Sequence, residues 1–120
     1  MRFRGCLPSL ALVAVLVGTA QAEERSFTIA NIEYEGTKAF VPSTLVVTQG
    51  DVVKVKILNN VKSDPNQHGF ALPDFKIEQV VTRGEPQEVV FTADKAGIFP
   101  IQCHLHPAHL GGQLVVLGKK

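Results

Sequence analysis

The sequence is poor in several residue types that metal and nucleic-acid sites often use. Its 120 residues include no tryptophan, two cysteines and one methionine, which is Met1. The body of the chain therefore has no thioether to offer to a metal. Twelve basic residues against eleven acidic ones give a formal net charge of +1. Such a balance does not favour binding to nucleic acid or to an anionic membrane surface.

The N-terminus has the pattern of an export signal. Two arginines precede an apolar run from Leu7 to Val17, and Ala20-Gln21-Ala22 has the small-x-small form of a signal-peptidase site. The alternative is a retained membrane anchor, but the run is about half as long as the ~20 residues of a spanning helix. We predict a cleaved signal peptide over residues 1–22 and one folded domain over residues 23–120. The domain is expected in the periplasm, without stable membrane insertion.

Export makes the cysteine count informative. Cleavage after Ala22 removes Cys6 and leaves Cys103 as the single thiol. In an oxidising compartment thiols usually pair or oxidise. A lone thiol there is buried, pairs with another chain, or is held by a metal. The histidines around Cys103 favour the metal.

Beyond residue 23, no segment has the periodicity of a long amphipathic helix. Short apolar runs alternate with turn residues, which is typical of an all-β sandwich or barrel. In the clearest run, Val53, Val55 and Ile57 alternate with lysines. A loop over residues 59–66 leads to His68, which opens a His-Gly-Phe turn. We predict strands at residues 26–32, 44–48, 52–58, 87–93, 98–103 and 113–117.

One short segment holds most of the side chains that bind transition metals. Residues 103–109 read Cys-His-Leu-His-Pro-Ala-His, and the fourth histidine, His68, lies 35 positions before Cys103. Thiolate and imidazole are ligands that suit copper or zinc. The spacing C-x2-H-x2-H lets one loop present Cys103, His106 and His109 to a single ion. His68 would close the site from another part of the fold.

Each candidate ligand also has a simpler explanation. Cys103 alone is compatible with a buried structural cysteine, His109 with a surface histidine that caps the loop, and His68 with a hydrogen-bonded loop histidine. His104 is expected to point away from Cys103, because successive side chains of a strand alternate. A nucleophilic Cys103–His106 pair is a further alternative, but no oxyanion loop or substrate motif accompanies it.

The choice between copper and zinc depends on more than the ligand types. One thiolate with three imidazoles also suits structural zinc, which takes closed tetrahedral sets of nitrogen and sulfur ligands. Such zinc sites usually stabilise small folds that lack a core of their own, whereas this chain has enough strands to build one. The residues favour copper and leave zinc open.

Taken together, these motifs resemble the cupredoxins, small exported copper proteins. The resemblance implies an all-β Greek-key β-sandwich or barrel with one mononuclear copper per chain. It also implies one-electron transfer to a redox protein partner, and it favours an electron carrier over an enzyme. The segments that carry it are Gly50-Asp51-Val52-Val53, His68-Gly69-Phe70, Asp94-Lys95-Ala96-Gly97-x-Phe99, Cys103-x-x-His106-Pro107 and Gly112-x-Leu114-x-Val116.

Within this family the pattern is most similar to the nitrosocyanins, the red copper proteins of ammonia oxidisers. The likeness lies in residues 91–97 and in Cys103-x-Leu105-His106-Pro107 followed by His109-Leu110. It implies copper ligation by Cys103, His106 and His109. Two features depart from that pattern: the loop before His109 is shorter, and His68 stands where those proteins have a glutamate ligand. The likeness keeps two other functions open, a site that binds or transforms a small molecule such as a nitrogen oxide, and a copper carrier.

Overall fold

The computed structural model describes residues 5, 8–14 and 23–119 of the chain. Residues 8–14 are exposed and form no regular secondary structure. The expected cleavage point after Ala22 lies outside the described residues, so the extent of the signal peptide stays a prediction. Among the described residues, no helix has the length and apolar character needed to cross a membrane.

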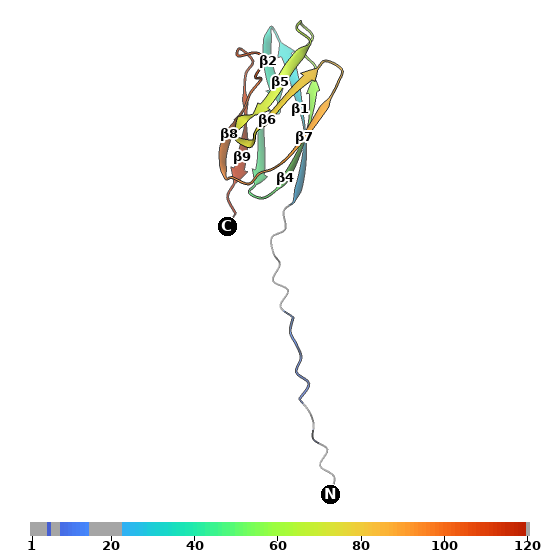
Figure 1. The fold of residues 1–120 in the computed structure, drawn as a ribbon, viewed down its shortest axis with the longest axis vertical. Coiled ribbons are helices and arrows are strands. Elements are labelled where there is room, and N and C mark those ends of the chain that lie inside the picture. The colour runs from blue at the N-terminus through green and yellow to red at the C-terminus, as the bar shows by residue number, and fades with distance from the viewer. Residues whose placement is uncertain (1–4, 6–7, 15–22, 120) are drawn as a thin grey trace.

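The described part of the chain folds into nine β-strands and one short 3-10 helix (Figure 1). The strands form sheets with the orders β2-β1-β4-β7, β3-β9-β8 and β5-β6. This is the all-β Greek-key sandwich that the sequence predicts. The elements are β1 (Glu24–Tyr34), β2 (Thr37–Val41), β3 (Thr44–Thr48), β4 (Val52–Asn59), β5 (Gln67–Leu72), η1 (Pro73–Phe75), β6 (Ile77–Thr82), β7 (Gln87–Thr92), β8 (Gly97–Ile101) and β9 (Gly112–Leu117).

Two strand pairs in the sandwich are parallel, and the other pairs are antiparallel. β1 pairs in parallel with β4, and β3 pairs in parallel with β9. Parallel neighbours cannot be joined by a tight hairpin, so the chain must cross between sheets before it returns. These crossings bring segments that are distant in the sequence to the same end of the sandwich.

Alternation along the strands builds the core between the sheets. Val53, Val55 and Ile57 of β4 are fully buried, as predicted, and Ile29 of β1 lies opposite Ile57 in the register. Leu114 of β9 packs into the same cluster. Burying an aliphatic side chain of this size contributes about 1.5–3 kcal/mol. The shared core fixes the sheets relative to one another, and with them the loops at each end.

Each of the six predicted strands is present in the structure, but three further strands were not predicted. β2, β5 and β6 were not expected, and residues 68–70, predicted as a turn, lie within β5. Glycine is depleted in strands, which is why Gly69 indicated a turn. β8 ends at Ile101, so Cys103 lies in the following loop and does not end the strand.

Candidate metal site

The segment between β8 and β9, residues 102–111, lies at the end of the sandwich away from the C-terminus (Figure 1). We call it the ligand loop. Its backbone turns twice: the His106 N–H donates to the Cys103 carbonyl (3.3 Å), and the His109 N–H donates to the His106 carbonyl (3.0 Å). Cys103 and His109 are buried and His106 is half-buried. The predicted donors therefore occupy successive turns of one loop.

Two attachments hold the ligand loop to the rest of the fold. At its start, Ala71 of β5 and Gln102 exchange two backbone hydrogen bonds of 2.7 and 2.9 Å. Near its end, the Leu110 N–H donates to the carbonyl of Lys38 in β2 (2.9 Å). The first attachment ties the loop to the strand that carries His68.

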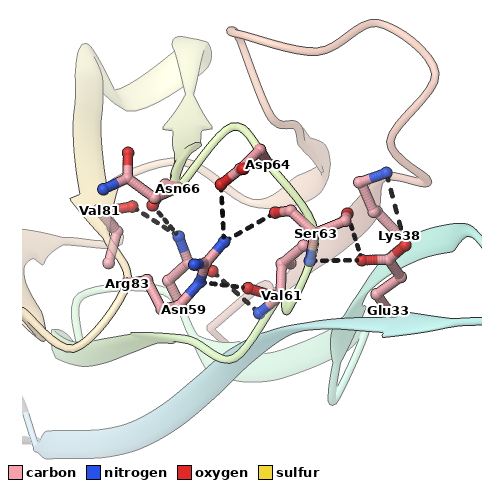
Figure 2. Close-up of polar contacts among 9 residues, drawn as sticks. All are labelled: Glu33, Lys38, Asn59, Val61, Ser63, Asp64, Asn66, Val81 and Arg83. Carbon is pink, nitrogen blue, oxygen red and sulfur yellow. Dashed lines mark hydrogen bonds and ion pairs between the residues drawn. The ribbon is translucent and has the colours of Figure 1, made fainter.

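The loop that precedes His68 is fixed by the side chain of Asn59 (Figure 2). Asn59 Nδ2 donates to the Asn66 carbonyl (3.0 Å) and to the Val81 carbonyl (2.9 Å), and Asn59 Oδ1 accepts from the Val61 N–H (3.1 Å). One buried amide therefore connects both ends of this loop to the neighbouring strand β6. Because the loop ends directly before β5, the same bonds set the position of His68.

Charged side chains brace the same loop from outside (Figure 2). Arg83 donates to the Val61 carbonyl (2.7 Å) and to the Ser63 carbonyl (2.8 Å). The Ser63 N–H donates to Glu33 Oε2 (3.2 Å), and the Ser63 hydroxyl donates to the same oxygen. The hydroxyl hydrogen bond is the main cause that lowers the pKa of Glu33 below its ordinary value. The loop is thus anchored to β1 as well as to β6.

Three of the four predicted ligands meet at one point. The potential ligand atoms of His68, Cys103 and His106 all lie within 4.8 Å of one another. Cys103 Sγ lies 3.5 Å from His106 Nδ1, and the ring centroids of His68 and His106 are 4.5 Å apart. The backbone N–H of Gly69 lies 3.1 Å from Cys103 Sγ and donates to it, which orients the sulfur. Two imidazoles and one thiol form the donor set of the electron-transfer copper sites with trigonal His2Cys ligation.

His68 has ring nitrogens that the protein itself does not satisfy. The residue is fully buried, and neither ring nitrogen has a hydrogen-bond partner among the described residues. Leaving one such buried group unpaired costs about 1–3 kcal/mol. Burial, and then the neighbouring His106 and His109, lower the pKa of His68 to about 4. The ring is therefore neutral near pH 7 with a free lone pair, so the residues present fit a bound metal ion.

His109 is near this group but makes hydrogen bonds of its own. Its Nδ1 lies 2.8 Å from the Leu110 carbonyl, and its Nε2 lies 2.8 Å from Asn31 Oδ1. Its ring centroid is 5.8 Å from that of His68. Burial lowers the pKa of His109 below its ordinary value. The structure thus brings His68, Cys103 and His106 together, while ligation by His109 stays a prediction.

His104 points away from the three meeting donors, as predicted, but the strand alternation on which that prediction was based ends at Ile101. Its Nε2 lies 3.4 Å from Glu78 Oε1. Its ring packs directly over Gly69, and a Cβ at Gly69 would clash with the His104 ring nitrogen. The absence of a side chain at Gly69 lets β5 and the ligand loop approach each other. This packing explains a glycine in the interior of a strand.

Sequence reasoning missed Asn31, the partner of His109. Asn31 is fully buried in β1 on the same face as Ile29. A signal was present, because Asn31 is a polar residue at an inward position of the predicted strand 26–32. Its partner is 78 residues away, however, and no pattern in the sequence identifies that partner.

Sequence comparison places these observations among known proteins. A model of the cupredoxin-like domain matches residues 8–116. Nitrous-oxide reductase of Cupriavidus necator is 34% identical over 74 residues, which are 60% of this chain and 12% of that protein. Nitrous-oxide reductase of Ralstonia nicotianae is 38% identical over 64 residues, which are 52% of this chain and 10% of that protein. The chain thus matches only about a tenth of the length of these curated relatives.

Solved structures agree in fold. A copper nitrite reductase from Nitrosomonas europaea matches with a TM-score of 0.69 and 21% identity, over 82% of this chain and 43% of that chain. Auracyanin A, a "blue" copper protein from Chloroflexus aurantiacus, matches with a TM-score of 0.60 and 23% identity, over 78% and 98% of the two chains. At these identities the likeness establishes the fold.

Proposed function

Because this chain belongs to the cupredoxin-like domain family, we propose that it is an exported protein that binds one copper ion and carries one electron at a time. The observation that carries the proposal is the meeting of His68, Cys103 and His106, with both His68 ring nitrogens buried and unpaired among the described residues. A redox protein is the expected partner.

The four predicted ligands have different roles in this proposal. His68, Cys103 and His106 are the principal donors, because their ligand atoms already lie within 4.8 Å of one another. His109 is the fourth donor, at the place in the loop where blue-copper sites have a weak axial methionine. An imidazole is a stronger donor than a thioether, so it favours Cu(II) and lowers the reduction potential.

Electron carriage depends on what the chain does around the ion. Bound copper would supply a one-electron couple between Cu(II) and Cu(I). The sheets hold His68 in a regular strand, and the Gly69 N–H fixes the sulfur of Cys103. Both residues are buried, which keeps water from the thiolate. A site held in this way changes little between oxidation states, and small rearrangement favours fast electron transfer.

A second candidate function is a nitrosocyanin-like site that binds or transforms a small molecule such as a nitrogen oxide. The observation that favours it is that both ring nitrogens of His109 have hydrogen-bond partners. With His109 so engaged, three protein donors remain and one position is open, as in metal sites that bind substrate. The curated relatives are named for nitrous oxide reduction, which makes a nitrogen oxide a reasonable ligand to test. A copper carrier is a third possibility.

The test is copper loading of the exported protein, followed by absorption and electron paramagnetic resonance spectroscopy. We expect about one copper per chain, and azide binding much weaker in the wild type than in His109→Gly. His104→Ala is the matched control within the loop and should leave the spectra unchanged, because its ring points away. Azide binding equally tight in the wild type and in His109→Gly would favour the small-molecule site. Stoichiometric zinc that copper cannot displace would overturn the copper proposal.

A further inference from the structure

The pair formed by Asn31 and His109 lies outside the group of three meeting donors. Asn31 is fully buried, and among the described residues the one hydrogen-bond partner of its side chain is His109; its Nδ2 has none. The His109 ring lies against Phe40, with centroids 4.5 Å apart, and its Nδ1 meets the Leu110 carbonyl. His109 is therefore held between a backbone carbonyl and a side-chain amide.

The hydrogen-bond capacity of these groups determines where the protons lie. The Leu110 carbonyl can only accept, so Nδ1 of His109 must carry a hydrogen. A neutral imidazole has one N–H, which leaves Nε2 as a lone pair. A charged ring would donate from both nitrogens, but burial disfavours the charged form. Nε2 of His109 therefore needs a donor.

Asn31 can supply that donor. The oxygen and nitrogen of an asparagine amide are assigned from the hydrogen-bond network. Rotating the Asn31 amide by a half-turn places Nδ2 against Nε2 of His109, at the position now assigned to Oδ1. The bond then runs from the Asn31 amide to the His109 lone pair. The same rotation gives the buried Nδ2 a partner and moves Oδ1 to the position that Nδ2 occupied.

This assignment gives Asn31 a role toward the metal. Nδ1 of His109 is protonated and bound to Leu110, so Nε2 is the one nitrogen of His109 left to ligate. We propose that Asn31 is a positioning residue that competes with the metal for this lone pair, and so sets how firmly His109 closes the fourth coordination position. The inference rests on the proposed copper site.

Competition of this kind creates two states of the site. In the closed state His109 binds the metal, and in the open state it binds Asn31. A small ligand enters only the open state, so its apparent affinity falls with the fraction of molecules that are closed. The strength of one buried hydrogen bond thereby decides between a closed electron carrier and a site that admits a small molecule.

The first test uses the metal-free protein. Nitrogen-15 NMR of the histidine rings should show His109 with a hydrogen on Nδ1 and a bare Nε2. A ring with its hydrogen on Nε2 would overturn the proposal, because Asn31 would then have no lone pair to hold. This result does not depend on copper, so it stands even if copper fails to bind and the proposed function falls.

The second test uses two substitutions of opposite effect in the copper-loaded protein. Asn31→Leu removes the competing donor, so His109 closes more firmly and azide should bind about tenfold more weakly than to the wild type. Asn31→Asp offers only acceptors, which keeps a hydrogen on Nε2, so azide should bind nearly as tightly as to His109→Gly. Equal azide affinity in the wild type and in Asn31→Leu would overturn the proposal.

Two controls separate this role from a general effect on folding. Thr28→Leu places the same side chain at an exposed position of β1 and should leave azide affinity unchanged. Asn31→Leu in a His109→Gly background should also have no effect, because Asn31 acts through His109. A tenfold change in that background would show that Asn31 acts by another route and would overturn the proposal.

Discussion

His68 and His109 are both buried beside the same site, yet they come from regions built in different ways. His68 lies in β5, within a regular ladder where it is paired with Val81. Its ring nitrogens have no partner among the described residues. His109 lies in the ligand loop, and both its nitrogens are within 2.8 Å of a partner. Burial alone does not mark a ligand. Among the described histidines, His68 is the one with both ring nitrogens buried and unpaired, which is the stronger indication; His104 has one such nitrogen, Nδ1.

The two regions also differ in how they can respond to a metal. Moving His68 would break the ladder between β5 and β6 and the contacts of Asn59 that fix the preceding loop. Moving the His109 ring requires the loss of only side-chain hydrogen bonds. In the proposed copper site, the strand therefore provides a fixed donor, and the loop provides an adjustable one.

The largest effect is expected from substitution of Cys103, the residue of the ligand loop that supplies the sulfur. Cys103→Ser should abolish the thiolate-to-copper charge-transfer colour completely, because the sulfur provides that transition. Absorption spectra of copper-loaded wild type and variant make the measurement. Strong visible colour that persists in the serine variant would mean that Cys103 is not a ligand.

The comparison of the two histidines predicts unequal losses of copper affinity. His68→Ala should weaken copper binding by at least about 100-fold, since a fixed direct donor is lost and even outer-shell partners of a ligand are worth about 10–100-fold. His109→Ala should weaken copper binding only about tenfold, because in the wild type the bond of His109 to copper is offset by the loss of its bond to Asn31. Competition against a chelator of known affinity measures both. The reverse order would show that the loop, and not the strand, supplies the fixed donor.

Acid should weaken the metal-free protein through His68. Its pKa is about 4 when folded and near 6.5 when unfolded, so between these values the unfolded chain binds more protons. Stability is then full above pH 6.5 and falls as the pH drops toward 4, by about 3 kcal/mol from this residue. Urea unfolding across this range tests it. His68→Leu should remove most of the slope, and an unchanged slope would contradict the assignment.

The smallest effect is expected in the loop that leads to His68. Arg83→Met removes hydrogen bonds to the Val61 and Ser63 carbonyls at a half-exposed position, and should lower the free energy of unfolding by about 1 kcal/mol. Lys62→Met, at an exposed position of the same loop, is the matched control and should have little effect. A larger loss from Lys62→Met than from Arg83→Met would contradict the bracing role.

The sequence predicted those parts of the fold that depend on local patterns. β4 was found because Val53, Val55 and Ile57 alternate toward a core, and buried positions enforce that alternation. β5 was missed because Gly69 is a poor strand residue by itself. The presence of Gly69 within this strand is explained only by the His104 ring packed over it, which is a contact between distant segments.

In the candidate site too, local spacing predicted some features, whereas others depend on contacts between distant residues. Cys103 and His106 are three positions apart, so their convergence could be predicted from spacing. His68 was found because it is the one histidine outside the loop, and its unpaired nitrogens became visible only in three dimensions. The bond of His109 to Asn31 joins residues 78 positions apart. Hydrogen-bond partners at that separation depend on the topology of the whole sandwich.

The backbone bridge between Ala71 and Gln102 has a consequence for the order of events during maturation. His68 and Cys103 lie on the two segments that this bridge joins, so they meet only after the long intervening chain has closed. Closing such a loop costs conformational entropy, and contacts between distant residues form slowly. A copper ion that meets the unfolded chain finds the Cys103–His106 pair but not the full donor set. The complete set of three converging donors therefore exists only in the folded chain.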